Sequence, residues 1–503
     1  MNVTPRMVSL ADVASVAAKR EHFVRTHSGS VQPGDIFVSL PRAVPLGPDG
    51  LDFSSAAKFL QDAIHRGAAY IVCPECVFTE TLPFLGDMPL AVAFAQDTRA
   101  ALGILAASAY GTGDSSLSLL AVTGTNGKTT STYLLEAVLR AAGLVPGIIG
   151  TVEYRWPGHE EPSPLTTPGA LELHSMLAAM RKAGADAAVM EVSSHAIEQN
   201  RIASLAFNGA LFTNLTQDHL DYHHDMETYF EIKARLFSRP EQGGIMPGGA
   251  ALAVNADDPY GARLLSANTD ILGYGFNSNE GVALRGVILA HGRDGLHLRM
   301  TYEGRTWDIR SPLAGDFNAY NLLGVQALAL AMGIDASYLQ ALSSVSGVPG
   351  RLERIANDRG LSVFVDYAHT PDALIKAQQA LRGAGFTRII TVFGCGGDRD
   401  RSKRPRMGEA AASLSDVVVL TSDNPRREDP ARIMDDVRPG LAGARRVIED
   451  VDRKKAIYLA LEETQPGDAL LVAGKGHEPY QIIGDVKYPF SDQQVIREYL
   501  GCA

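Results

Sequence analysis

The sequence predicts an α/β protein of three domains with mostly parallel sheets. Short apolar runs alternate with helical patterns along the chain, the order that places helices on the faces of a parallel sheet. Polar residues gather directly after these runs, and ligands of open α/β sheets bind outside the carboxyl ends of the strands. A chain of 503 residues has room for roughly three to four domains. We place the boundaries at residues 1–97, 98–345 and 346–503.

The first domain is predicted to be a small α/β unit. Residues 34–40 and 68–73 are apolar runs typical of short strands, and residues 53–66 between them have the spacing of a helix. Residues 96–99 then lead into a new helix.

The second domain is predicted to hold a mostly parallel sheet. Its strands are expected where apolar runs end in polar clusters, at residues 117–122, 187–192, 209–213 and 251–255. Alternating side chains over 286–310 favour an antiparallel meander at the sheet edge. A long apolar helix is expected from Asp316 to Met332.

The third domain repeats the order of strand, loop and helix. Strands are expected at residues 362–365, 388–393, 416–420 and 468–472. This striped order predicts a doubly wound sheet, and polar clusters at strand ends in two sheets favour a cleft between domains.

The composition is that of an ordinary soluble globular protein, with 46% hydrophobic and 20% charged residues. The net charge of −11 argues against a nucleic acid held by bulk electrostatics. Acidic substrates must therefore be bound by local cationic clusters.

Cysteine usage and the N-terminus both indicate a cytoplasmic protein. Four cysteines make no disulfide framework, and we interpret Cys73 and Cys76 as incidental thiols, with metal or redox use as the alternative. Residues 1–20 have no apolar signal core, and the apolar stretch 100–113 is too short to span a bilayer.

A phosphate site is predicted between the strand at 117–122 and a helix from Lys128 through Arg140. A helix N-terminus after a Gly-rich turn offers free N–H groups and a positive dipole end to an anion. Gly124 and Gly127 let the backbone approach, Lys128 adds a charge and Thr129 a hydroxyl for Mg²⁺. Val122 stands where the standard loop has its first glycine, which indicates a subfamily with its own loop. The alternative is a Gly-rich turn with a surface lysine.

A Mg²⁺ site is predicted from Thr129, Glu191 and His219, because a hard cation on triphosphate oxygens prefers hydroxyl and carboxylate ligands. The rival is zinc bound by histidines 219, 223 and 224, whose spacing lacks a cysteine or carboxylate partner. Lys233 lies in a helical pattern with apolar neighbours, and this segment alone favours a surface lysine whose stem packs on the helix.

Two arginine clusters are predicted to bind carboxylates, because planar guanidinium groups pair with them in a bidentate manner. They comprise Arg399, Arg401, Lys403, Arg404 and Arg406 in one loop and Arg426 and Arg427 in another. Glu478 is a candidate for a substrate ammonium. The alternative is a solvated basic surface.

Nine segments together resemble the Mur ligase family, in particular the MurE type that adds the third residue of the peptidoglycan stem peptide. They are Thr123–Thr130, Thr166–Pro168, Glu191–His195, Thr213–His223, Asn255–Asp258, Asp366–Asp372, Gly394–Asp400, Asp423–Arg426 and Gly474–Glu478.

The resemblance implies an N-terminal UDP-binding domain, a central P-loop-type ATPase domain and a C-terminal Rossmann-like domain that binds the amino acid. It implies a ligase that uses ATP and Mg²⁺ to join meso-diaminopimelate to UDP-N-acetylmuramoyl-L-alanyl-D-glutamate. The D-glutamate carboxylate is phosphorylated and the incoming amine attacks the acyl phosphate, which turns a poor electrophile into a good one. A monomer is expected.

Residue roles follow from the matched motifs. The implied catalytic residues are Lys128, Glu191, His219 and Lys233, and the metal ligands are Thr129, Glu191, His219 and Lys233 as a carbamate. The resemblance therefore replaces the interpretation of Lys233 as a surface lysine by that of a carbamylated metal ligand. ATP is expected at Gly124, Thr125, Asn126, Gly127, Lys128, Thr129, Thr130, Asn318, Arg351 and Asp366. The muramoyl dipeptide is expected at Ser28, Thr166, Thr167, Ser193, Gln199 and Arg201.

Diaminopimelate is expected at Arg399, Asp423, Asn424, Pro425, Arg426, Gly474 and Glu478. Its distal carboxylate, which lysine lacks, is expected to pair with Arg426. The N-terminal domain departs from the pattern, because Ser28 keeps its place but the arginine that follows it in many relatives is missing. The remaining alternatives are a lysine-adding ligase, a relative of folylpolyglutamate synthetase, and a nucleotide-binding regulatory protein.

Overall fold

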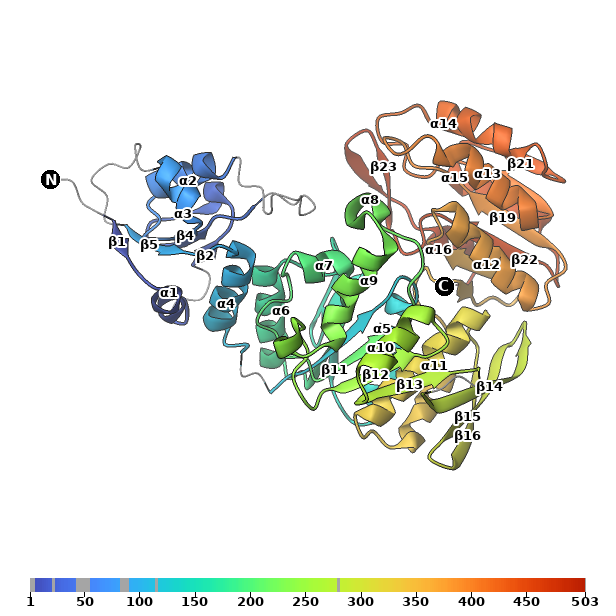
Figure 1. Ribbon diagram of the computed structural model, residues 1–503. Coiled ribbons are helices and arrows are strands. Elements are labelled where there is room, and N and C mark those ends of the chain that lie inside the picture. Colours follow the sequence, from blue (N-terminus) through green and yellow to red (C-terminus); the bar gives the residue numbers. More distant parts are fainter. Residues whose placement is uncertain are drawn as a thin grey trace. The chain divides into compact units, whose positions relative to one another are not determined.

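The computed structural model describes residues 5–19, 23–41, 55–81, 90–113, 116–277 and 281–502. Its contacts divide the chain into two units. The first holds the N-terminal and central sheets, and the second holds an antiparallel meander and the C-terminal sheet (Figure 1). The expected α/β class with three sheet domains is confirmed, whereas the domain boundaries stay predictions.

The N-terminal sheet is parallel and buried on both faces. Its order is β1 (Arg6–Met7), β5 (Ala91–Phe94), β4 (Tyr70–Cys73), β3 (Ile36–Val38), β2 (Val24–Arg25). Ile36 and Val38 pack with α1 (Leu10–Ala17) and α4 (Thr98–Tyr110). Phe37 faces the opposite way, toward the core it shares with α2 (Ala56–His65) and α3 (Glu75–Thr81). The expected strands and helix are confirmed, except that residues 53 and 54 lie outside the described ranges.

The central sheet carries the predicted parallel strands. Five parallel neighbours lie in the order β13 (Ile271–Gly275), β12 (Ala251–Asn255), β11 (Gly209–Phe212), β6 (Ser118–Thr123), β10 (Ala187–Glu191), followed by β7 (Pro146–Ile149), also parallel. An antiparallel extension, β8 (Glu153–Trp156) and β9 (His159–Pro162), was not predicted.

The helices of the central part follow its strands. They are α5 (Lys128–Ala141), α6 (Ala170–Lys182), α7 (Ser194–Glu198), α8 (Leu220–His223), α9 (Met226–Ala234) and α10 (Pro259–Ala267). Apolar residues of α6, α7, α9 and α10 join the sheet in one core that includes Leu119, Met190 and Phe212. Strands β6, β10, β11 and β12 each end in a loop that enters a helix, the arrangement that positions functional side chains in such sheets.

The predicted meander and long helix are confirmed. Strands β14 (Val282–Gly292), β15 (Gly295–Tyr302) and β16 (Arg305–Ser311) pair antiparallel, and α11 spans Asp316–Ala331.

The C-terminal sheet has helices on both faces. Its order is β17 (Glu353–Ile355), β18 (Ser362–Asp366), β22 (Ala469–Ala473), β19 (Ile389–Phe393), β20 (Val417–Leu420), β21 (Val447–Glu449), and all neighbours except β17 are parallel. Phe364 packs with α12 (Pro371–Gly383), α13 (Lys403–Leu414) and α14 (Pro430–Val437). Val363 and Val365 pack with α15 (Arg453–Glu463) and α16 (Asp492–Leu500). The doubly wound sheet is confirmed.

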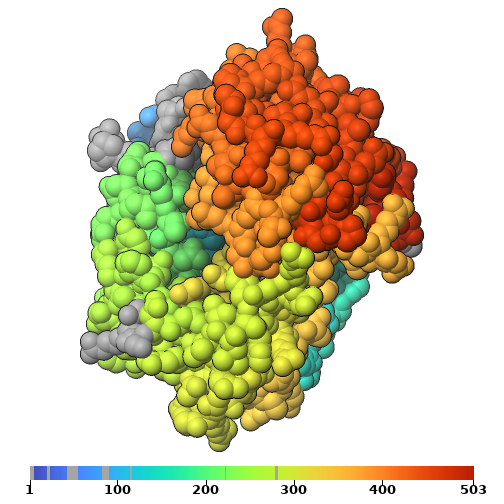
Figure 2. All heavy atoms as spheres, turned by 90° about the vertical axis from the view of Figure 1, so that its right-hand side faces the viewer, coloured from blue at the N-terminus to red at the C-terminus, as the bar shows by residue number. Residues whose placement is uncertain are grey.

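A two-stranded hairpin, β23 (Tyr480–Ile483) and β24 (Val486–Pro489), follows the last sheet strand. Figure 2 shows the surface of the C-terminal part in orange and red. Within the described ranges, no helix has the length and apolar character needed to cross a bilayer.

Candidate active-site residues

The predicted phosphate loop connects β6 to α5, as expected. Gly124 has a φ of +143°, and a Cβ there would stand 2.0 Å from the Thr213 hydroxyl oxygen, so the position admits only glycine. Gly127, with φ +85°, is the N-cap of α5. The first turn of this helix therefore directs its N–H groups at the loop, where an anion is stabilised.

The loop after β11 holds the phosphate loop in shape. The backbone N–H groups of Thr125 and Asn126 donate to the Asn214 carbonyl oxygen at 2.8 Å and to its Oδ1 at 3.0 Å. The Thr213 hydroxyl donates to the Asn126 carbonyl at 2.7 Å. Because β6 and β11 are adjacent strands, their two end loops meet and fix each other.

Lys128 folds back over the loop that it follows. Its Nζ donates to the carbonyl oxygens of Gly124 at 3.0 Å and Thr125 at 2.8 Å. The ammonium is thus held at the mouth of the anion site, on acceptors that a phosphate oxygen can replace.

Lys233 is buried beside the same loop, so the interpretation as a surface lysine is wrong. Its side chain is 1% exposed, and its Nζ donates to Gly124 O at 3.1 Å and to Thr123 Oγ1 at 3.3 Å. Burial, and next the charge of Lys128, hold the pKa of Lys233 well below its ordinary value. Tyr229, one helical turn earlier on α9, places its ring 5.0 Å from Nζ. Both effects favour the neutral amine over the ammonium form.

Glu191 ends β10 as a fully buried carboxylate. Its Oε1 accepts from the Thr151 N–H at 2.8 Å and its Oε2 from the Thr151 hydroxyl at 3.0 Å. A Cβ on Gly150 would stand 2.6 Å from Oε1, so glycine makes room for the carboxylate. Thr129, 5% exposed, lies in the first turn of α5.

His219 stands at the N-terminus of α8 with a left-handed φ of +52° and a side chain that is 48% exposed. Its ring lies edge-on to His195, 5.0 Å between centroids, and His195 in turn lies 4.1 Å from the Tyr222 ring. In the described part of the chain, no group of three His, Cys, Asp or Glu side chains is arranged so that it could hold a metal ion by itself.

Four of the residues expected to bind the dipeptide form one connected network. Arg201 donates to the Thr167 carbonyl at 2.9 Å and to Gln199 Oε1 at 2.8 Å, and the Ser193 N–H donates to Thr167 Oγ1 at 3.1 Å. Burial lowers the pKa of Arg201. The Thr166 hydroxyl lies 3.1 Å from the hydroxyl of Thr151, which donates to Glu191.

Ser28 lies in the N-terminal part, in a short 3₁₀ helix (Ser28–Ser30), and is 6% exposed. Its hydroxyl bonds to Asp62 and is the main cause of the lowered pKa of that carboxyl group. Cys73 in the same sheet is buried, and burial raises the pKa of its thiol to about 12, which fits an inert thiol better than a redox or metal role.

Asn318, Arg351 and Asp366 belong to the second unit. Asp366 ends β18 and accepts from the N–H groups of Leu352 at 2.6 Å and Ala368 at 2.8 Å. Burial raises the pKa of Asp366, and the charge of Arg351 opposes this shift. Asn318 is 2% exposed in α11.

Some arginines of the two predicted clusters pair with carboxylates of the chain itself. Arg404 is 1% exposed and pairs with Glu428 at 2.7 Å, which also pairs with Arg401 at 2.9 Å. Arg427 pairs with Asp485 at 2.8 Å. The expectation that both clusters bind substrate carboxylates throughout is therefore too wide, because Arg401, Arg404 and Arg427 already pair with carboxylates of the chain.

Arg399 and Arg426, the two cluster residues predicted to bind diaminopimelate, both have side-chain atoms beside Gly396. A Cβ there would stand 2.9 Å from Arg426 NH1 and 3.7 Å from Arg399 Cγ. Arg426 has a φ of +50°, and its NH1 donates to the Gly397 carbonyl at 2.8 Å. In the part of the chain that the structure describes, no carboxylate pairs with either guanidinium.

The loops after β20 and β22 bring the other predicted amino-acid-binding residues together. Asn424 Nδ2 donates to Glu478 Oε2 at 2.9 Å. Gly474 has a φ of +115°, and a Cβ there would stand 2.5 Å from Asp423 Oδ2. Pro425, between Asn424 and Arg426, is buried.

Sequence reasoning missed two buried cations beneath these loops. Arg453 and Asp492 form an ion pair at 2.7 Å in which both side chains are 0% exposed, and Arg453 also donates to Ser422 O and Ala473 O. Lys475 is 0% exposed as well. The Gly474–Glu478 motif was the only signal for Lys475, and no local signal marks a pair 39 residues apart.

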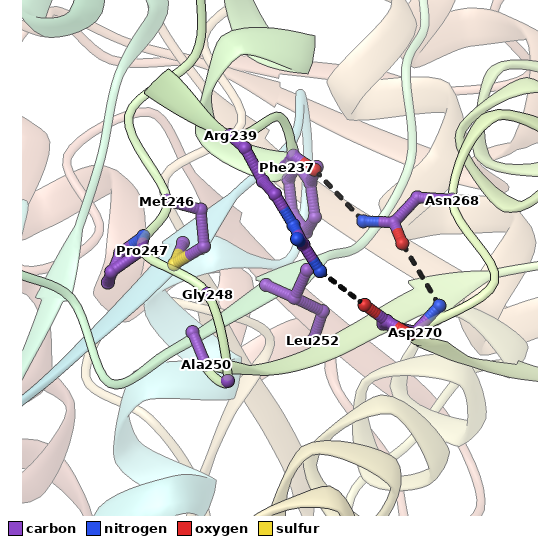
Figure 3. Close-up of a pocket in the computed structure, with 10 residues that line it drawn as sticks. Phe237, Arg239, Met246, Pro247, Gly248, Ala250, Leu252, Asn268 and Asp270 are labelled. Carbon is purple, nitrogen blue, oxygen red and sulfur yellow. Dashed lines mark hydrogen bonds and ion pairs between the residues drawn. The ribbon is translucent and has the colours of Figure 1, made fainter. Parts of the chain in front are cut away.

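A pocket of about 300 Å³ is lined by none of the predicted site residues (Figure 3). Phe237, Met246 and Leu252 line it, and Arg239 pairs with Asp270 across it at 2.8 Å. Arg239 and Asp270 are exposed and neutralise each other, so this pair leaves no charge available in the pocket for a ligand.

Comparison with known proteins connects these loops to one family. The model of the Mur ligase middle domain matches residues 122–329, and that of the Mur ligase glutamate ligase domain matches residues 350–476. A UDP-N-acetylmuramoyl-L-alanyl-D-glutamate–2,6-diaminopimelate ligase from Lawsonia intracellularis is 50% identical over 498 residues, 98% of this chain and 99% of the relative.

Solved structures agree with this match. A UDP-N-acetylmuramoyl-L-alanyl-D-glutamate–2,6-diaminopimelate ligase is 31% identical, with a TM-score of 0.67 over 96% of this chain and 95% of the other. MurF ligase from Thermotoga maritima in complex with ADP has a TM-score of 0.58 at 17% identity, over 96% and 97% of the two chains, and this likeness shows the fold alone.

Proposed function

Because the chain belongs to the Mur ligase family, we propose that it is the ATP-dependent ligase that adds meso-diaminopimelate to UDP-N-acetylmuramoyl-L-alanyl-D-glutamate in peptidoglycan precursor synthesis. The reaction belongs in the cytoplasm, where this precursor synthesis takes place, and a monomer stays the expectation from the sequence.

The arrangement around Gly396 carries the choice of amino acid. The Arg426 guanidinium and the side-chain stem of Arg399 lie there, and neither arginine has a carboxylate partner among the described residues. Asn424 holds Glu478 in the neighbouring loop. Diaminopimelate has a carboxylate and an ammonium group at each end, so guanidinium and carboxylate groups suit it together. Lysine lacks the distal carboxylate and would leave a guanidinium unpaired, which costs binding energy.

ATP phosphates are proposed to bind at the loop of residues 124–130. The N–H groups at the start of α5 face the anion, and the Lys128 ammonium exchanges its two carbonyl acceptors for phosphate oxygens. The D-glutamate carboxylate then attacks the terminal phosphorus of ATP, and the bond from that phosphorus to the bridging oxygen breaks. ADP is the leaving group, and the substrate now carries an acyl phosphate. Lys128 disperses the negative charge that builds up on the phosphoryl oxygens.

Mg²⁺ is proposed to be held by Thr129, Glu191, His219 and Lys233 as a carbamate. The hydroxyl of Thr129 and the buried carboxylate of Glu191 are oxygen donors of the kind that this ion prefers. When bound, the ion neutralises charge on the phosphate oxygens.

The environment of Lys233 supports its carbamylation. Its buried amine has a lowered pKa, and a neutral amine adds CO₂: an N–C bond forms, the nitrogen loses a proton, and a carbamate anion results. This change replaces a group that repels a cation by one that binds it, next to Lys128, which benefits from a negative neighbour.

In the second half-reaction, the amine of diaminopimelate attacks the carbonyl carbon of the acyl phosphate and inorganic phosphate leaves. The amine must be neutral to attack, since an ammonium has no lone pair. The Thr167–Ser193–Gln199–Arg201 network is proposed to hold the muramoyl dipeptide during both steps, and its half-buried guanidinium suits a carboxylate of that substrate.

Release of phosphate tests this function. Purified protein is incubated with ATP, Mg²⁺ and the muramoyl dipeptide, together with meso-diaminopimelate, lysine or no amino acid. We expect rapid release with diaminopimelate only. No dependence on any added amine would refute the ligase function, and a preference for lysine would refute the choice of substrate.

A further inference from the structure

Lys475 is a buried cation in the loop that follows β22. Its side chain is 0% exposed. A buried ammonium is costly unless charges and hydrogen bonds compensate for the lost water. The groups around Lys475 therefore show what this charge does.

Three residues of the proposed amino-acid site surround the ammonium. Lys475 Nζ donates to Asn424 Oδ1 at 3.0 Å and to Glu478 Oε2 at 3.4 Å. Asp423 Oδ1 lies 3.7 Å away. One lysine thus touches both loops that meet at this site.

Lys475 determines which way the amide of Asn424 points. Asn424 Oδ1 accepts from Lys475 Nζ and also from the Ile482 N–H of the hairpin at 2.9 Å. With two donors on the oxygen, the Nδ2 group must face the other side, where it donates to Glu478 Oε2 at 2.9 Å. Without the ammonium, the amide loses one of the two donors that select this orientation.

The same contacts orient the carboxylate of Glu478. Among the hydrogen bonds of the described residues, both that reach this side chain end on Oε2, which leaves Oε1 for a substrate. The charges also match: Asp423, Glu478 and Lys475 together carry one net negative charge, and the nearby pair Arg453–Asp492 is neutral. One negative charge suits one substrate ammonium.

We propose that Lys475 is a positioning residue that orients Asn424 and Glu478 to receive an ammonium group of the incoming diamino acid. This role rests on the proposed ligase function and adds to it a residue that sets amino-acid recognition without touching the substrate.

Steady-state kinetics of Lys475→Met test the role, because methionine is an unbranched side chain, one atom shorter than lysine, that carries no charge. We expect the KM for diaminopimelate to rise about tenfold or more, as for a lost hydrogen bond to a charged group. The KM values for ATP and the dipeptide should stay within about twofold of wild type. Lys454→Met is the matched control, since Lys454 is an exposed lysine of the same part, paired with Glu498.

A double-mutant cycle separates positioning from a general structural effect. If Lys475 acts through Glu478, Lys475→Met combined with Glu478→Gln should lose about tenfold less in kcat/KM for diaminopimelate than the product of the single losses. Lys475→Arg keeps the positive charge and should raise the KM for diaminopimelate less than Lys475→Met does. If Lys475→Met does not fold, Lys475→Arg takes its place in the double-mutant cycle.

Three outcomes overturn the proposal: an unchanged KM for diaminopimelate in Lys475→Met, an equal rise of KM for all three substrates, or additive losses in the cycle. The wild-type protein checks the underlying function separately. Absence of diaminopimelate-dependent phosphate release in wild type refutes that function, whereas an active wild type with additive losses refutes only the role of Lys475.

Discussion

Lys128 and Lys233 donate to the same acceptor, the carbonyl oxygen of Gly124, at 3.0 and 3.1 Å. Two ammonium groups so close together repel each other, and Lys233 is the one without access to water. The pKa of Lys233 is accordingly lowered, with burial as the main cause and Lys128 next. The fold thus favours the neutral form of this amine beside a phosphate loop, and the neutral form is the one that can add CO₂.

Lys233→Ala should reduce ligase activity by about 10²–10³-fold, the range found when one preorganised electrostatic group is removed from a transition state. Acetate or formate added at high concentration should restore part of the activity, because either anion replaces the carbamate in the space left by the side chain. Phosphate release with and without added acid measures both effects. Lys182→Ala, at an exposed lysine of α6, is the control and should behave as wild type in either condition. A fully active Lys233→Ala variant would rule out the carbamate.

Arg426→Ala should weaken the use of diaminopimelate while sparing ATP. A buried or half-buried charge pair is worth more than a neutral hydrogen bond, so we expect kcat/KM for diaminopimelate to fall about 10–100-fold. Discrimination against lysine should shrink, because the distal carboxylate then has no partner. Arg426→Lys should rescue little, since an ammonium lacks the planar fork of a guanidinium.

The neighbouring residue supplies the control for this prediction. Arg427→Ala removes an equally large cation, whose pair with Asp485 is 71% and 74% exposed and therefore worth little. We expect its kinetics to match wild type. Equal effects of the two substitutions on all substrates would show that Arg426 has no specific role.

Local patterns were sufficient for the strand, loop and helix of the phosphate site. Leu119–Thr123 is apolar and β-prone, two glycines follow, and the helix begins at Lys128 as expected. By contrast, β9 could not be predicted, because His159–Pro162 is a polar, largely exposed stretch with no apolar alternation. A short edge strand of this kind is specified by its partner and not by its own residues.

The burial of Lys233 and the division of the arginines needed the tertiary structure. The spacing around Lys233 fits a surface helix and a buried one equally well, and its acceptors lie 109 and 110 residues away. Arg399 lies in the loop before α13 and Arg404 five positions later in its first turn, yet of the two only Arg404 reaches Glu428. Which cations of a cluster remain available therefore depends on carboxylates that are distant in sequence.

Gly124→Ala should abolish ATP binding. The φ of +143° is costly for any residue with a side chain, and the new Cβ would stand 2.0 Å from Thr213 Oγ1, so the loop must move. Isothermal titration with ATP should show no measurable binding, while circular dichroism should show a folded protein. Gly143→Ala is a useful comparison, because Gly143 also has a positive φ but has no atom within 4 Å of a new Cβ. ATP affinity equal to wild type in Gly124→Ala would mean that the loop geometry is not required.

Acid should destabilise the C-terminal part through Glu428. Its hydrogen bonds to Arg404, the largest cause, lower the pKa of Glu428 from 4.5 to about 2. A carboxyl group with a lowered folded-state pKa binds a proton more readily when unfolded, so its stabilising contribution is complete above pH 4.5 and is lost as pH falls toward about 2.

Urea denaturation at about pH 5.5 and pH 3.5 checks this dependence. The free energy of unfolding should fall less between these values in Glu428→Gln than in wild type, because the substituted side chain does not titrate. Glu409→Gln, at an exposed glutamate on the helix that carries Arg404, should keep the wild-type slope. Identical slopes for all three proteins would contradict the assignment.

The buried pair of Arg453 and Asp492 should matter more for stability than any surface pair. Both side chains are 0% exposed, and Arg453 joins the ends of β20 and β22 through Ser422 O and Ala473 O. Asp492→Asn leaves an uncompensated buried cation, so the free energy of unfolding should fall by about 3–5 kcal/mol. Arg453→Met together with Asp492→Leu removes both charges and should cost less than Asp492→Asn alone, because no charge is left unpaired. Chemical denaturation of the two variants decides the matter: if the double variant is the less stable one, the hydrogen bonds of Arg453 to the two loops outweigh the cost of an unpaired charge.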